Sequence, residues 1–151
     1  MPPSTRPDPY ANHNFKVTIT GVSDDPTDVS ASFSEVTGLK IDIAAITYRN
    51  GSEVQTPRKI PGIFTYGDLT FKRGITGHIL FYNWLLEALN GRVRRTSGSI
   101  VLLDENRQEV MRWNFDRGWP TNYTGPTMNG STNEIAIESM TMAIENLRID
   151  Q

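Results

Sequence analysis

The sequence has 151 residues, a formal net charge of -2 and no cysteine. This length fits one domain with a hydrophobic core, and the missing cysteines exclude disulfides, thiolate catalysis and cysteine-ligated metals. Because the net charge is small and negative, no global basic field favours nucleic acid or an anionic membrane. Hydrophobic residues make up 37%, and the 12 glycines and 9 prolines favour a fold rich in strands and loops.

The N-terminal residues 1–12 contain four prolines and no periodic pattern, so we expect an extended arm that becomes ordered on a partner. The segment has no apolar run and is read as neither a secretory signal nor a membrane span, so we expect folding in the cytoplasm. Residues 14–20 then alternate, with Phe15, Val17 and Ile19 on one face. This alternation predicts a strand that is buried on one side.

Two further strands, over 33–36 and 41–48, precede a segment of different character. Residues 49–67 are rich in turn residues, yet they carry Ile60, Ile63, Phe64 and Tyr66. A segment of this length with several large apolar side chains is unusual for an idle loop. We therefore predict a hairpin or loop whose apolar residues need a partner.

A short strand over 69–74 leads through a glycine turn into the one long helical pattern, which spans Gly77 to Asn90. Apolar residues spread around most of its circumference, so the helix needs cover on more than one side. Asn90 and Gly91 predict a left-handed C-cap. We expect this helix to pack as a single element against a β structure.

The remaining residues predict strands again. Residues 100–103 are apolar on both faces and residues 110–115 alternate. Residues 119–123 should form an edge or bulged strand because Pro120 cannot donate to a ladder. The last strand spans about 134–147, with a bulge or bend near Ser139 where the apolar parity changes. About eight strands and one helix indicate a mainly β sandwich or partly closed barrel.

The sequence offers no active site. His13 and His78 lack companions at metal-ligand or triad spacing, and the acidic stretch 24–28 lacks the regular spacing of a calcium loop. Glu134 and Glu138 flank a strand and are explained more simply as solvated acids than as a general acid–base pair. We therefore expect no enzyme activity, no cofactor and no metal site.

Nine short phrases follow one another in a characteristic order: NFKV at 14–17, FSEVTGL at 33–39, YRNG at 48–51, KIPG at 59–62, LTFKRG at 69–74, LLDE at 102–105, WNF at 113–115, WP at 119–120 and NEIAIES at 133–139. Their order and spacing resemble the phage tail tube protein family, which includes inner tube proteins of contractile injection systems. Each phrase alone is weak, but the series covers roughly residues 9–149 and is specific.

This resemblance implies a single domain over 1–151 with two packed antiparallel sheets, or a distorted β-barrel, flanked by one α-helix. Six copies would close into a ring, and rings would stack into a hollow tube inside a contractile sheath on a baseplate. The tube would conduct cargo, either protein effectors or DNA, through a target envelope. The particle would be assembled in the bacterial cytoplasm.

The resemblance also implies which residues make contacts. The arm, the hairpin and the C-terminal tail would supply the subunit and ring-stacking contacts, through Tyr10, Phe15, Tyr48, Arg49, Val54, Lys59, Ile60, Ile63, Phe64, Leu147 and Ile149. Candidates for the lumen surface are the polar-face residues Thr18, Thr20, Asp42 and Arg112.

Two other interpretations stay open at this stage. The secreted ring protein of type six secretion would share the fold, although the nine phrases favour the phage-like branch. A monomeric β-sandwich or barrel would instead bind a small ligand or sugar through tryptophan and tyrosine side chains. The choice between DNA and protein cargo, and between a phage and a headless particle, is also open.

Overall fold

The computed structural model describes residues 8–20, 33–49, 51, 57–75 and 80–150. The chain forms nine strands and one helix in these ranges. Their bounds are β1 Phe15–Ile19, β2 Phe33–Thr37, β3 Ile41–Tyr48, β4 Arg58–Tyr66, β5 Leu69–Gly74, α1 Leu80–Leu89, β6 Thr96–Leu103, β7 Glu109–Thr124, β8 Ile137–Ala143 and β9 Asn146–Asp150.

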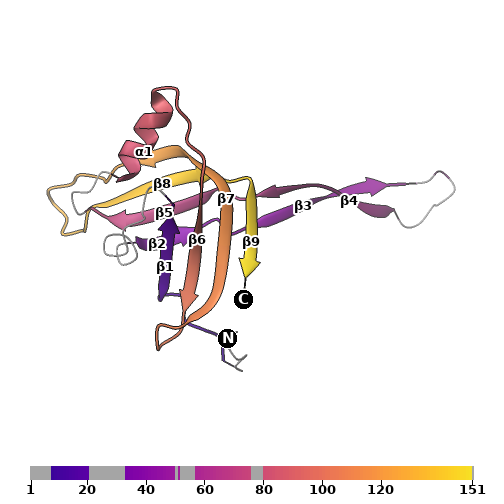
Figure 1. Ribbon diagram of the computed structural model, residues 1–151, viewed down its shortest axis with the longest axis horizontal. Helices are drawn as coiled ribbons and strands as arrows, with labels where there is room; N and C mark the ends of the chain where they lie inside the picture. The colour runs from indigo at the N-terminus through magenta and orange to yellow at the C-terminus, as the bar shows by residue number, and fades with distance from the viewer. Residues whose placement is uncertain (1–7, 21–32, 50, 52–56, 76–79, 151) are drawn as a thin grey trace.

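The long strand β7 connects two halves of one antiparallel sheet (Figure 1). Residues 109–118 of β7 pair with β6, which pairs with β1, and residues 112–116 also pair with β9 on the other side. We call these strands the first half-sheet. Residues 119–124 of β7 pair with β8, followed by β5 and β2, and form the second half-sheet. Strands β3 and β4 form a separate two-stranded hairpin.

The two half-sheets pack face to face around one hydrophobic core. Phe115 of the first half-sheet and Phe71 of the second have ring centroids 6.5 Å apart, and Phe33 lies against Phe71 at 5.8 Å. The buried cluster contains Val17, Ile19, Phe33, Leu69, Phe71, Trp84, Ile100, Phe115, Met140, Met142, Ile144 and Leu147. The expected fold of two packed antiparallel sheets with one flanking helix is confirmed.

Helix α1 packs against β7, mainly through one buried side chain. Trp84 is 2% exposed and its indole Nε1 donates to the Arg94 carbonyl at 3.1 Å. The predicted cap is confirmed: Gly91 has a φ of 86°, and Arg92 N donates to Glu87 O at 2.9 Å, as in a Schellman motif. Leu89 is 68% exposed, so the subunit does not cover the side of the helix on which this residue lies.

The predicted last strand differs from the structure in two ways. It is divided into β8 and β9, which run along the same side of β7 and are separated at Ile144 and Glu145. The bulge predicted near Ser139 is wrong, because the pairing of β8 with β5 is regular through that residue. The extra residue lies in β7, between Pro120 and Asn122, which confirms the bulged alternative of the predicted edge or bulged strand.

One end of the core contains a buried ion pair. Arg73 and Glu138 are 2% and 5% exposed, and Arg73 Nε lies 2.6 Å from Glu138 Oε1. The Tyr123 hydroxyl donates to Glu138 Oε2 at 2.7 Å, so both carboxylate oxygens have partners. Burial of two charges is tolerated because they are paired and hydrogen-bonded. The interpretation of Glu138 as a solvated acid is therefore wrong.

Gly98 is required where β1 and β6 approach the core. A Cβ atom at this position would lie 2.3 Å from the Thr18 carbonyl oxygen and 2.6 Å from the Phe115 ring. We expect Gly98→Ala to lower the free energy of unfolding by about 1–3 kcal/mol, measured by urea denaturation. Gly130→Ala is the control, because nothing lies within 4 Å of its Cβ position, and its effect should stay below about 0.5 kcal/mol. Equal effects would contradict this account.

The hydrogen bond from Tyr123 to Glu138 should stabilise the fold at neutral pH and be lost at alkaline pH. The hydrogen bond from Tyr123 and the nearby carboxylate, with burial, raise the pKa of the phenol above its usual value. Because the pKa is raised on folding, the protonated Tyr123 hydroxyl contributes its full share to the free energy of unfolding below pH ~10. This contribution disappears as the pH rises through the folded-state pKa. At neutral pH, Tyr123→Phe should cost about 1–2 kcal/mol of unfolding free energy.

The cost of Tyr123→Phe should then shrink at alkaline pH, in urea denaturation at several pH values. The control is Tyr82→Phe, which removes an exposed phenol of α1 and should change stability little at any pH. A cost for Tyr123→Phe that does not depend on pH above ~10 would contradict the assignment.

Candidate assembly surfaces

The hairpin of β3 and β4 projects from the body of the molecule (Figure 1). All residues of β3 are exposed, and in β4 only Gly62 and Tyr66 are partly covered. An isolated two-stranded hairpin is at best marginally stable in water, and an exposed apolar strand pair is an association site. The hairpin is therefore a surface that needs a partner.

Apolar side chains occupy both faces of the hairpin. Its exposed large hydrophobic residues are Ile41, Ile43, Ile46, Tyr48, Ile60, Ile63 and Phe64, with Ile63 the most exposed at 79%. The pairs Ile43–Phe64 and Ile46–Ile60 are directly opposite one another across the ladder. Residues 43 and 46 of β3 point to opposite faces, and the register shift between Ile43 and Ala45 adds one residue to β4, so these two pairs lie on opposite sides. Cover on a single side would leave one of them in water.

The structure extends the predicted hairpin and gathers most of its contact residues. The segment predicted as 49–67 includes β4, but β3 is the other arm, so the described hairpin runs from 41 to 66. Tyr48, Arg49, Lys59, Ile60, Ile63 and Phe64 are all exposed on it, and Val54 lies outside the described residues. Ile41, Ile43 and Ile46 are also exposed on the hairpin but were not among the predicted contact residues. A strand rich in β-branched residues has the same sequence pattern whether it is covered or exposed.

The contact residues predicted outside the hairpin lie in different environments. Tyr10 and Phe15 are partly buried, and Phe15 packs against the core. Ile149, on β9, is 55% exposed and free to meet another surface. Leu147 is 5% exposed and belongs to the core of its own subunit, so its predicted place at a subunit contact is not supported.

The face of the first half-sheet that points away from the core is polar except for Val101, which is 3% exposed. Cross-strand pairing places Lys16, Val101, Arg112 and Asp150 in one row, and Thr18, Ser99, Asn114 and Arg148 in the next. We call this surface, together with Thr20, Glu109 and Asp116, the polar face. It gathers three of the four lumen candidates, Thr18, Thr20 and Arg112. Asp42 instead lies on β3, where it pairs with Lys40 at 3.1 Å.

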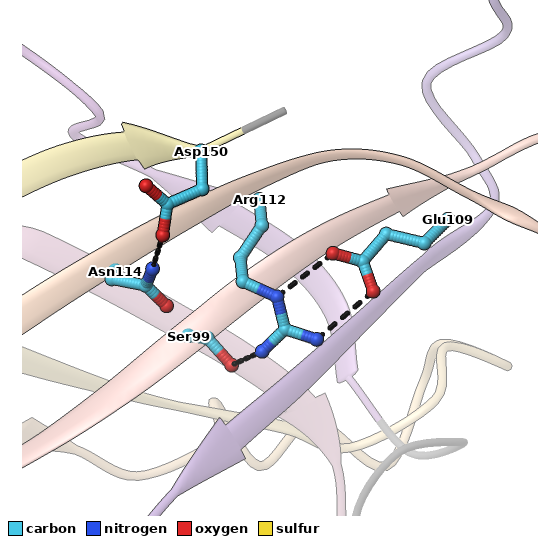
Figure 2. A network of polar contacts seen from close by, with 5 residues as sticks. All are labelled: Ser99, Glu109, Arg112, Asn114 and Asp150. Carbon is cyan, nitrogen blue, oxygen red and sulfur yellow. Dashed lines mark hydrogen bonds and ion pairs between the residues drawn. The ribbon is translucent and has the colours of Figure 1, made fainter. Parts of the chain in front are cut away.

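Charged groups on the polar face bind one another (Figure 2). Arg112 donates two hydrogen bonds to Glu109, from Nε to Oε1 at 2.8 Å and from Nη2 to Oε2 at 2.9 Å. It also donates from Nη1 to Ser99 Oγ at 3.3 Å. Asn114 donates to the carboxylate of Asp150. The hydrogen bond from Arg112 is the main cause that lowers the pKa of Glu109, and the charge of Lys16 adds to it.

No helix of the described residues has the length and apolar character needed to cross a membrane. Within the same ranges, no three or more histidine, cysteine, aspartate or glutamate side chains gather where they could hold a metal ion.

Two half-sheets packed around a core, with an exposed apolar hairpin that projects from them, are typical of a protein that associates with other subunits. The chain belongs to the family described as T4-like virus tail tube protein gp19, whose model matches residues 11–148. Its role is therefore structural, as a component of a tail tube, and the resemblance drawn from the nine phrases is confirmed. A comparison with curated protein sequences finds no match.

Solved structures share this fold. A chain of the sheath-tube complex of an extracellular contractile injection system, PVC, in its extended state has a TM-score of 0.79 at 24% identity, over 94% of this chain and 91% of that one. A chain of the tube-terminating cap of the anti-feeding prophage has a TM-score of 0.83 at 24% identity, over 99% and 95%. Hcp1 from Flavobacterium johnsoniae has a TM-score of 0.52 at 12% identity, over 90% and 94%.

Proposed function

We propose that six copies of this protein close into a ring and that the rings stack into a hollow tube. The observation that carries the proposal is the hairpin 41–66, whose apolar side chains are exposed on both faces. One face is covered by a neighbour in the same ring and the other by a subunit of the adjacent ring. A hairpin that contacts a different surface on each neighbour makes a head-to-tail contact, which closes into rings or continues as a filament.

Repetition makes such a tube rigid. Stable protein interfaces bury about 1,200–2,000 Å² of total surface. A subunit held by lateral and axial contacts at the same time gains avidity, because each contact raises the effective concentration of the next. The exposed residues of α1, including Leu89, and Ile149 at the C-terminus offer further apolar surface for these contacts.

The tube works inside a contractile sheath, starts from a baseplate and conducts cargo when the sheath shortens. Support comes from the similar chains in the PVC sheath-tube complex and in the baseplate of the anti-feeding prophage, the latter at 17% identity and a TM-score of 0.80. The particle is assembled in the bacterial cytoplasm, and the protein leaves the cell only as part of it.

The polar face lines the lumen of this tube. The opposite face of the same strands is used by the core, and the hairpin lies outside the first half-sheet. A water-filled channel favours polar walls, because its lining stays solvated. The lumen surface is then formed by β1, β6, β9 and the first part of β7 from every subunit.

The hairpin is tested by a charge placed at its most exposed apolar residue. We expect Ile63→Asp to abolish rings and tubes in negative-stain electron microscopy while the subunit stays folded, because a carboxylate cannot be buried unpaired at the contact. The association constant should fall at least a hundredfold, measured by sedimentation over a range of concentrations. Met128→Asp is the matched control, because Met128 is 81% exposed outside the hairpin.

Two results would count against the proposal. Rings formed by Ile63→Asp as readily as by the wild type would remove the hairpin from the contact. A wild-type chain that stays near 17.0 kDa at every concentration would exclude self-assembly as an intrinsic property and would return attention to ligand binding by a single subunit.

A further inference from the structure

We propose that the polar face is a charge-balanced surface suited to polypeptide cargo and not to nucleic acid. The inference rests on the proposed function, in which this face lines the tube. It concerns the class of cargo, which neither the fold nor the family membership decides.

The polar face carries equal numbers of cations and anions, and four of these six charges form ion pairs, Arg112 with Glu109 and Arg148 with Asp116. It carries three cations, Lys16, Arg112 and Arg148, and three anions, Glu109, Asp116 and Asp150. Arg112 binds Glu109 with two hydrogen bonds (Figure 2). The same balance continues along β9.

On β9, Arg148 lies 3.3 Å from Asp116, which also accepts a hydrogen bond from Asn146. Asp150 accepts from Asn114, and its charge contributes to raising the pKa of Arg112. Lys16 acts on Glu109 through its charge. Each strong charge on this face therefore has a counter-charge or a hydrogen-bond donor within the same subunit.

A surface whose charges are paired offers few free cations to the phosphates of a nucleic acid. Proteins hold nucleic acid through lysine and arginine side chains that replace condensed counterions on the phosphates. Arg112 and Arg148 already hold carboxylates, so binding a phosphate would require breaking an existing ion pair. A wall that repels nucleic acid would instead need a net negative charge, because only a single-signed surface produces a long-range field. The polar face has neither property.

A polypeptide cargo places the opposite demand on the wall. Protein surfaces carry both signs of charge, interspersed. A lumen of either net sign would therefore hold the complementary patches of a passing protein. Paired charges cancel beyond about one Debye length, roughly 8 Å at physiological salt. A balanced wall thus adheres weakly to cargo of both signs, and the polar face meets this requirement.

The inference is tested by substitutions that leave an excess of cations on the polar face, followed by a measurement of nucleic-acid binding to the tube. Wild-type tubes and tubes of the Glu109→Gln/Asp150→Asn double variant are mixed with a fluorescent single-stranded oligonucleotide, and binding is followed by anisotropy over a salt series. The double variant frees Arg112 and removes two negative charges, which raises the net charge of every subunit by two. We expect no measurable binding to the wild type and at least tenfold tighter binding to the variant, with an affinity that falls as salt rises.

The matched control makes the same change in net charge away from the polar face. Glu35→Gln/Glu87→Gln also removes two negative charges and frees two cations. Glu35 pairs with Lys72 at 3.2 Å on the second half-sheet, and Glu87 of α1 pairs with Arg94 at 3.1 Å. We expect this control to protect no oligonucleotide from nuclease, whereas the polar-face variant protects it inside the tube.

The outcomes separate the inference from the proposed function. Electron microscopy of each sample first establishes that tubes are present, and their absence in the wild type overturns the proposed function and the inference with it. Wild-type tubes that bind and protect the oligonucleotide would show a nucleic-acid conduit and overturn the inference alone. Equal protection by both variants would also overturn it. If the double variant does not assemble, Glu109→Gln alone provides the same comparison.

Discussion

The shared strand β7 is the constraint on which the rest of the body depends. Its 16 residues are divided between the two half-sheets. The strand bends near Arg117, which has a φ of 56°, and near the extra residue between Pro120 and Asn122. This bend turns the two half-sheets toward each other and places Phe115 against Phe71. At Gly118 a Cβ would lie 2.9 Å from Met142 Sδ and 3.1 Å from the Phe115 ring, so a larger residue there would require these side chains to shift. Without the bend, each half-sheet would expose its apolar face to water.

Stability and association are divided between separate parts of the chain. The core of the body is closed within one subunit, down to the buried Arg73–Glu138 pair with its tyrosine partner. Apart from Tyr66, which packs against that core, the hairpin stays outside it and exposes residues such as Ile63 and Phe64. We therefore expect the subunit to fold before it assembles. In the proposed tube, the apolar side chains of the hairpin would be buried only when neighbouring copies cover them.

The same strands of the first half-sheet serve the core and the polar face. In β7, Trp113 and Phe115 point toward the core, while Arg112 and Asn114 alternate with them on the opposite side. The ion pairs of the polar face are held by backbone ladders that the core keeps rigid. Positions on the polar face therefore keep a defined charge pattern, which a loop surface would not.

The sequence by itself determined the positions of most strands, the C-cap at Gly91 and the family, because period-two alternation, turn residues and ordered phrases are local signals. It did not determine which face of each strand is covered. Glu138 lies inside because Arg73 and Tyr123 meet it from β5 and β7. Ile43 lies outside because, among the described strands, β3 pairs only with β4 and is exposed along its length. Only the tertiary structure decided these points, since burial depends on partners that are distant in sequence.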